Sequence, residues 1–158
     1  MYYHIIESPI GPILLAGDEE GLKYVNLRKG KKKIEVPDSW VENEDFFREI
    51  SGQLEAYFAG ELKSFDVKLA PEGTEFQKSV WKALCEIPYG ETRTYGEIAK
   101  SIGNPKASQA VGLSNNRNPI SIIVPCHRVI GANGKLTGYA SGLDVKEFLL
   151  KLEENNLK

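Results

Sequence analysis

Cysteine and histidine are scarce in this chain of 158 residues, which contains two of each. The two cysteines, Cys85 and Cys126, cannot build a disulfide framework, and the scattered cysteines and histidines lack the spacing of a zinc finger. No apolar run approaches the roughly 20 residues needed to cross a bilayer. The first residues also lack the basic flank and apolar core of a secretory signal. We therefore expect a cytoplasmic protein with no membrane partner.

The net charge of −2 at pH 7 hides an uneven distribution. Residues 1–75 hold 9 Lys and Arg against 15 Asp and Glu, whereas residues 76–158 hold 11 against 7. A positive second half is typical of proteins that meet a polyanion, although charge alone is equally compatible with chance. The basic run at residues 28–33 lies in the acidic half and favours a solvated loop.

The first part of the chain predicts a small α/β domain. Three β-rich segments separated by Gly, Pro and Asp turns predict an antiparallel meander. These segments are residues 2–7, 12–16 and 22–27. Apolar side chains spaced by three and four predict an amphipathic helix over residues 43–59, which Gly60 ends. A short strand near residues 65–69 would complete the domain.

The second part predicts a mainly helical domain. We place the boundary in the linker Pro71-Glu72-Gly73, which gives domains of residues 1–70 and 71–158. Thr74 and Gln77 have capping-box spacing ahead of a helical pattern. Cys85 lies on that helix, and we interpret it as a small buried hydrophobic residue.

Two further short helices form a candidate helix-turn-helix. Thr94 and Glu97 repeat the capping-box spacing ahead of a helix that ends at Gly103, and Asn104 and Pro105 favour a second helix that starts there. The alternative is a pair of packed core helices without a ligand. The small residues of the second helix favour close approach to a narrow minor groove. They are Ala107, Ser108, Ala110, Gly112 and Ser114.

The segment with the clearest chemistry follows residues 120–124, which predict a buried strand. Cys126, His127 and Arg128 come next, and positive neighbours lower the pKa of a thiol towards the nucleophilic thiolate. The alternative is a structural cysteine beside a salt-bridging arginine. Neighbouring residues of a strand point to opposite sides, so contact between thiol and imidazole needs a sharp turn or a bridging water. Asn118 is suited to hold such a turn.

The C-terminal helix offers a third group for this set. Glu153 falls at the edge of the apolar stripe, close to the direction of Leu149. A carboxylate there can reach inward and orient a histidine base. The alternative is a boundary side chain that extends to water.

These segments closely resemble the O6-alkylguanine-DNA alkyltransferases. The resemblance covers about residues 74–153, with a weaker match at Ser8-Pro9-Ile10-Gly11. It is carried by Ile87-Pro88-Tyr89-Gly90-Glu91-Thr92, Thr94-Tyr95-Gly96-Glu97-Ile98-Ala99, Gly103-Asn104-Pro105-Lys106-Ala107, Arg117-Asn118-Pro119, Pro125-Cys126-His127-Arg128-Val129-Ile130-Gly131 and Gly134-Lys135-Leu136-Thr137-Gly138-Tyr139.

The resemblance implies a small N-terminal α/β domain of ribonuclease H-like type, with an antiparallel sheet plus helix, and a mainly helical C-terminal domain with a helix-turn-helix. It implies repair of O6-alkylguanine by irreversible, single-turnover transfer of the alkyl group to Cys126, with O4-alkylthymine left open as a second substrate. The partner is double-stranded DNA, the protein is a monomer, and no cofactor is implied.

The resemblance also implies a role for each matching residue. Cys126 is the nucleophile, and His127 and Glu153 take its proton through a water. Tyr95 helps to extrude the nucleotide and to protonate the leaving base, and Asn118 holds the turn. The implied substrate pocket comprises Val129, Leu136, Tyr139, Ala140 and Ser141. The implied DNA contacts are Tyr95, Ala107, Ser108, Gln109, Ala110, Gly112 and Arg117.

The chain departs from the family pattern at two places. Gln109 stands where the family commonly has an arginine that fills the gap left by the flipped base. Ser141 replaces the first residue of a two-glycine stretch before the last helix. The zinc site of some relatives cannot form, because no cysteine precedes Cys85.

Three other functions would account for parts of this sequence. A relative that binds alkylated DNA without repairing it would lack the cysteine that is present at Cys126. A plain helix-turn-helix regulator would not need the set of Cys126, His127 and Glu153. A cysteine hydrolase would need an oxyanion hole, and the sequence shows no glycine arrangement for one.

Overall fold

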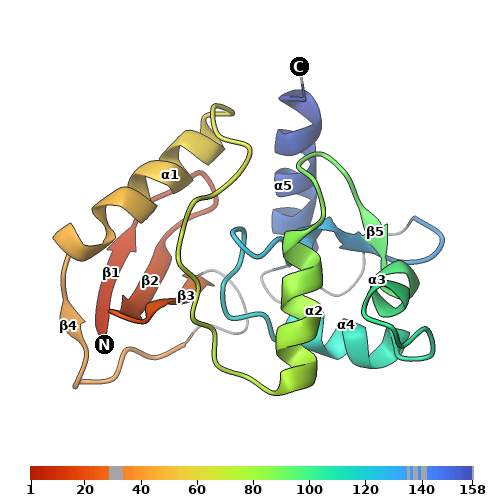
Figure 1. Cartoon of the computed structure of the whole chain (residues 1–158). Coiled ribbons are helices and arrows are strands. Elements are labelled where there is room, and N and C mark those ends of the chain that lie inside the picture. The colour runs from red at the N-terminus through yellow and green to blue at the C-terminus, as the bar shows by residue number, and fades with distance from the viewer. Residues whose placement is uncertain (29–33, 135, 137–138, 140–141, 158) are drawn as a thin grey trace.

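The computed structural model describes residues 1–28, 34–134, 136, 139 and 142–157. Figure 1 shows a sheet and one helix beside a second, helical part. The first part comprises β1 (Tyr2–Ile6), β2 (Ile13–Asp18), β3 (Gly21–Leu27), β4 (Val41–Glu42), η1 (Asp45–Phe47) and α1 (Arg48–Phe58). The second comprises α2 (Glu75–Cys85), β5 (Arg93–Thr94), α3 (Tyr95–Ser101), α4 (Ser108–Asn116), η2 (Cys126–Arg128), β6 (Val129–Ile130) and α5 (Leu143–Asn155).

The predicted antiparallel meander is confirmed. β1 pairs with β2 and β2 with β3, both antiparallel, and the sheet has the order β3-β2-β1-β4. The two-residue β4 adds a parallel neighbour to β1 that the sequence did not indicate. The first five residues of β2 are all buried, as expected for a central strand that is covered on both faces.

The predicted helix over residues 43–59 is present as η1 followed by α1. Gly60 follows α1 with a φ of 78°, a left-handed conformation that favours glycine at the end of a helix. The strand predicted near residues 65–69 is wrong. Within it only Leu69 forms an isolated bridge, to Leu22 of β3. The segment therefore meets the edge of the sheet at one point instead of adding a strand to it.

Both predicted capping boxes are confirmed. Thr74 and Gln77 exchange side-chain and backbone hydrogen bonds at the start of α2, and Thr94 and Glu97 do so at the start of α3. The interpretation of Cys85 as a buried residue is wrong, because its side chain is exposed. Cys85 is the last residue of α2 and follows a buried leucine, so the helical rotation of about 100° per residue turns it outward.

The predicted start of the next helix is also wrong. α4 begins at Ser108, and the preceding four residues form a turn in which Ala107 N–H donates to Asn104 O at 3.0 Å. Pro105 occupies the second position of this turn, which its fixed φ suits. The turn joins α3 to α4 and leaves two short consecutive helices in a helix-turn-helix order.

Residues 120–124 do not form the predicted strand. The chain coils here, with Val124 N–H donating to Ile120 O at 3.0 Å and Ile122 at a φ of 73°. The edge of the sheet supports the start of this coil. Val25 of β3 donates its N–H to Pro119 O at 3.0 Å and accepts from Ser121 N–H at 3.1 Å. The N-terminal sheet therefore holds a loop of the C-terminal part.

The last helix joins the two parts. Figure 1 shows α5 above α2, with α1 and the loop that follows it on one side. Lys63 in this loop donates to Leu157 O at 3.2 Å.

Of the helices within the described ranges, none is long and apolar enough to cross a membrane.

Candidate active site

A sharp turn presents Cys126. Cys126 is the first residue of the 3₁₀ turn η2. Cys126 and His127 are therefore not on an extended strand and need not point to opposite sides. Asn118 holds the preceding coil through its side-chain amide. Its Nδ2 donates to Val124 O at 2.8 Å, and its Oδ1 accepts from Ile120 N–H at 3.0 Å. The structure thus places Asn118 where the sequence suggested, tying together the backbone that leads to the cysteine.

A small parallel sheet brings a second predicted residue to the same region. β5 pairs with β6, with Arg93 opposite Val129. β6 directly follows the cysteine turn, and α3 directly follows β5. Tyr95, the first residue of α3, therefore lies at the strand that leads away from Cys126. Its ring also borders α4, because a Cβ on Gly112 would lie 3.8 Å from ring carbons of Tyr95.

The carboxylate of Glu153 is the centre of the buried polar groups. Its side chain is fully buried on α5 and accepts from His127 Nε2 at 2.6 Å. Arg128 donates twice, from Nε to Oε1 at 2.8 Å and from a terminal nitrogen to Oε2 at 3.0 Å. A forked arginine pair of this kind satisfies a buried carboxylate in both geometry and charge.

Two further donors complete the hydrogen bonding of the Glu153 carboxylate. The hydroxyl of Tyr57, on α1, donates to Oε2 of Glu153 at 2.6 Å, and Gly90 N–H donates to Oε1 at 3.2 Å. Arg128 uses its remaining terminal nitrogen on Ile87 O at 2.7 Å. The donors come from α1, η2 and the loop after α2, so one carboxylate connects three separate segments to α5.

The surroundings set the protonation states of Glu153 and His127. Burial opposes ionisation of Glu153, but hydrogen bonds from His127 and Arg128 and the positive charge of Arg128 outweigh it and hold the pKa of Glu153 well below its usual range. Burial lowers the pKa of His127, and Glu153 only partly opposes this. At neutral pH the pair is thus a carboxylate and a neutral imidazole, with the ring proton on Nε2 facing Glu153.

This tautomer leaves Nδ1 of His127 as a base. Nδ1 is buried, and within the described part of the chain no protein group hydrogen-bonds to it. Buried polar atoms normally have a partner, from protein, water or a ligand. A neutral imidazole with a lone pair at Nδ1 and a carboxylate behind Nε2 is the arrangement of an oriented general base.

The thiol of the preceding residue, Cys126, is buried as well. Burial raises the pKa of Cys126, whereas contacts with Asn118 and Tyr139 and the positive charge of Lys146 act in the opposite direction. The hydroxyl of Tyr139 approaches the thiol without a close hydrogen bond. The thiol is therefore protonated at rest, and its reaction as a nucleophile requires a base.

Lys146 is a cation within the core that the sequence reasoning missed. It lies on α5, is fully buried and donates from Nζ to Val129 O at 2.5 Å. Burial lowers its pKa to about 8, which keeps most of the group charged at neutral pH. The positive charge next to Cys126 favours the thiolate.

The other residues expected at the substrate pocket are only partly described. Val129 is fully buried in β6, and Leu136 and Tyr139 are half-buried. Ala140 and Ser141, also expected there, lie outside the described residues. Of this predicted set, the structure thus brings Val129 and Tyr139 to the region of Cys126.

The residues expected to meet DNA lie mainly on the outer face of α4. Ser108, Gln109, Ala110 and Arg117 are exposed, and Ala107 and Gly112 are half-buried. Ser114, counted among the small residues of this helix, is buried and does not belong to that face. The sequence reasoning missed Leu113, which is 59% exposed. It lies one turn from Gln109 and from Arg117, so the three form one stripe.

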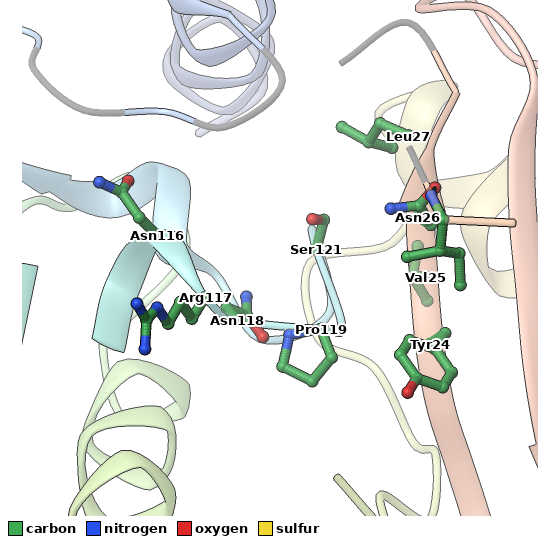
Figure 2. Close-up of a pocket in the computed structure, with 10 residues that line it drawn as sticks. Tyr24, Val25, Asn26, Leu27, Asn116, Arg117, Asn118, Pro119 and Ser121 are labelled. Atoms are coloured by element: carbon green, nitrogen blue, oxygen red, sulfur yellow. Dashed lines mark hydrogen bonds between the residues drawn. The ribbon is translucent and has the colours of Figure 1, made fainter. Parts of the chain in front are cut away.

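A groove lies between β3 and the segment that follows α4. Figure 2 shows Asn118, Pro119 and Ser121 on one wall and Val25 of β3 on the other. The cavity measures about 170 Å³. Cys126 is not among the residues that line it, so this groove is distinct from the expected substrate pocket.

The fold and site together define a two-part protein, in which an α/β unit supports a helical unit that carries a buried nucleophile, its base and a helix-turn-helix. The chain matches the family models described as 6-O-methylguanine DNA methyltransferase, ribonuclease-like domain, over residues 1–71, and DNA binding domain, over residues 75–155. The chain belongs to the methylated-DNA–protein-cysteine methyltransferase family. The expected fold class is thereby confirmed, and so is the expected activity, the repair of O6-methylguanine in DNA by transfer of the methyl group to a cysteine.

Individual relatives agree with this assignment. A protein of Methanosarcina acetivorans with that name is 91% identical over 97% of this chain and 98% of its own length. One of Methanosarcina mazei is 80% identical over the whole of both chains. The solved structure of Mycobacterium tuberculosis OGT in complex with DNA is 52% identical and superposes with a TM-score of 0.93, covering 99% of this chain and 94% of the other.

The buried imidazole predicts a pH dependence of stability. Because burial lowers the pKa of His127, the unfolded chain binds its proton more tightly, and the free energy of unfolding falls as the pH drops below about 6.5. His4 is the only other histidine, so the measurement uses a His4→Gln background. Urea unfolding between pH 7 and 5.5 should show the decline, and adding His127→Gln should flatten it. A decline of equal slope after that change would assign the effect to other groups.

Proposed function

We propose that this chain repairs O6-alkylguanine in DNA by transferring the alkyl group to Cys126 in a single, irreversible turnover. Family membership supports methyl transfer from DNA to a protein cysteine. The observation that selects Cys126 is its position in the turn next to His127, whose imidazole is oriented by Glu153. Cys85 is exposed and is the last residue of α2.

The proposed reaction begins with proton removal. The Sγ–H proton of Cys126 passes through a water to Nδ1 of His127, and Glu153 stabilises the resulting imidazolium through Nε2. The positive charge of Lys146 favours the thiolate, and the turn held by Asn118 presents it. Each of these groups is in contact with the cysteine or with the backbone around it.

The thiolate then displaces the base. A lone pair on Sγ forms the S–C bond to the alkyl carbon as the bond between that carbon and O6 breaks, with its electrons passing to the guanine. Tyr95 donates its hydroxyl proton to the leaving base and recovers one from solvent. The product is a stable thioether on Cys126, so each molecule reacts once, and no cofactor takes part.

The partner of the reaction is double-stranded DNA that contains the alkylated base. We propose that the outer face of α4 enters the minor groove and that Tyr95 helps to extrude the target nucleotide, which costs a few kcal/mol. The structure of the relative from Mycobacterium tuberculosis has been solved with DNA.

The chain described here acts as a cytoplasmic monomer. The boundary between its N-terminal domain and its DNA-binding, alkyl-transfer domain lies at residues 70 and 71.

The choice of cysteine has a direct test. After incubation with duplex DNA containing O6-methylguanine, intact mass should rise by one methyl group, and peptide mapping should place that group on Cys126. Cys85→Ser should react as the unchanged protein does, whereas Cys126→Ser should gain nothing. The two variants compare the exposed thiol of Cys85 with the buried thiol of Cys126, which has a histidine base next to it in the turn. Label on Cys85 would overturn the assignment.

Gln109 offers a test of base extrusion. An arginine there would bring a long, charged side chain suited to the negative potential of a narrow minor groove. We expect Gln109→Arg to speed repair in duplex DNA by about tenfold or less, which corresponds to roughly 1.4 kcal/mol of barrier. The rate with free O6-methylguanine should not change, because no extrusion is needed.

The matched control for Gln109→Arg is Leu113→Arg, which adds the same charge one turn away on the same exposed face. An equal gain in both variants would assign the effect to general attraction for DNA. An equal change on duplex and free base would place Gln109 in the chemistry of the pocket.

A further inference from the structure

We propose that Tyr57, a residue of the N-terminal domain, is a positioning residue of the transfer reaction, because its hydroxyl fixes the carboxylate that orients His127. The inference rests on the proposed function, since it concerns the base of that reaction. Tyr57 lies 96 positions from Glu153 in sequence, and no motif that carries the family resemblance includes it.

The geometry places Tyr57 on the same oxygen as the base. Oε2 of Glu153 accepts from the Tyr57 hydroxyl at 2.6 Å and from His127 Nε2 at 2.6 Å. Tyr57 is fully buried, and burial and the charge of Glu153 raise its pKa, so its hydroxyl stays protonated as a donor. Tyr57 and His127 thus share one acceptor atom, and a change at one donor alters the other.

The surrounding contacts make this a fixed arrangement. Gly60, just after α1, approaches the end of α5 so closely that a Cβ there would lie 2.4 Å from Asn156 Oδ1. Lys63 donates to Leu157 O in the same region. The C-terminal end of α1 is therefore docked against the end of α5, which keeps the hydroxyl of Tyr57 at Glu153.

The ring and the hydroxyl of Tyr57 have separable roles. The ring packs against Phe58, Phe65 and Tyr89, with centroids between 5.4 and 6.2 Å away. The hydroxyl bonds to Glu153. Tyr57→Phe therefore keeps the packing of the ring and removes the donor. Arg128 and Gly90 remain on the carboxylate, so the variant retains a paired Glu153.

Removing this donor has a predictable electrostatic sign. Fewer hydrogen bonds to the carboxylate raise the pKa of Glu153, and the freer Oε2 also raises the pKa of His127. Both changes move the acid limb of the pH–rate profile to higher pH. The less constrained carboxylate orients the imidazole less well, which slows transfer at neutral pH.

The experiment measures single-turnover transfer from duplex DNA containing O6-methylguanine, with excess protein, across pH. Tyr57→Phe should be about tenfold slower at neutral pH, should show the acid limb at higher pH, and should still take one methyl group per chain. The control is Tyr89→Phe, which removes a neighbouring buried hydroxyl that has no hydrogen-bond partner among the described residues. It should leave rate and profile unchanged.

A double-mutant cycle shows whether Tyr57 acts through Glu153. In a Glu153→Gln background, Tyr57→Phe should cause no further loss of rate. An equal loss in both backgrounds, or an unchanged rate and pH profile for Tyr57→Phe alone, would refute the proposal. If the unchanged protein gains no methyl group on Cys126, the proposed function fails instead, which is a different outcome.

A second variant keeps the test decisive if Tyr57→Phe does not fold. Replacing Tyr57 by 3-fluorotyrosine nearly preserves size and makes the hydroxyl more acidic and a stronger donor. The acid limb should then move to lower pH, opposite to the effect of Tyr57→Phe. An unmoved limb in a folded fluorotyrosine variant contradicts the role assigned to the hydroxyl.

Discussion

The structure depends on one buried carboxylate, Glu153. A charged group that is buried away from water destabilises a protein by several kcal/mol unless it is paired and hydrogen-bonded. Here Tyr57, Gly90, His127 and Arg128 supply the donors. Because the donors lie on separate segments, satisfying this carboxylate fixes α1, the loop after α2 and the cysteine turn relative to α5. The same requirement that stabilises the fold also selects the tautomer of the imidazole.

The N-terminal domain therefore contributes to the site without supplying the nucleophile. It holds Glu153 through Tyr57, and β3 holds the coil ahead of Cys126 through the backbone of Val25. Asn118 completes this support from within the coil. The nucleophile is thus presented by a short irregular segment whose conformation is fixed by groups outside it, a common arrangement for reactive side chains on loops.

Local patterns predicted what local interactions determine. The meander follows from alternation and turn residues, and both capping boxes follow from side chains three positions apart. Two failures occurred where distant contacts decide. The apolar run at residues 120–124 looks like a strand, but Asn118 and the edge of β3 coil it. Tyr57 has the pattern of a core aromatic residue, and only the docking of α1 on α5 reveals its hydroxyl as a partner of Glu153.

Glu153 holds His127 as a neutral base, with its proton on Nε2 and its lone pair on Nδ1. Nitrogen-15 NMR of the imidazole in the folded protein at neutral pH tests it directly, with His4→Gln removing the second histidine signal. We expect one N–H, at Nε2, and an unprotonated Nδ1. A proton on Nδ1, or on both nitrogens, would contradict it, because the ring could not then accept the proton of Cys126.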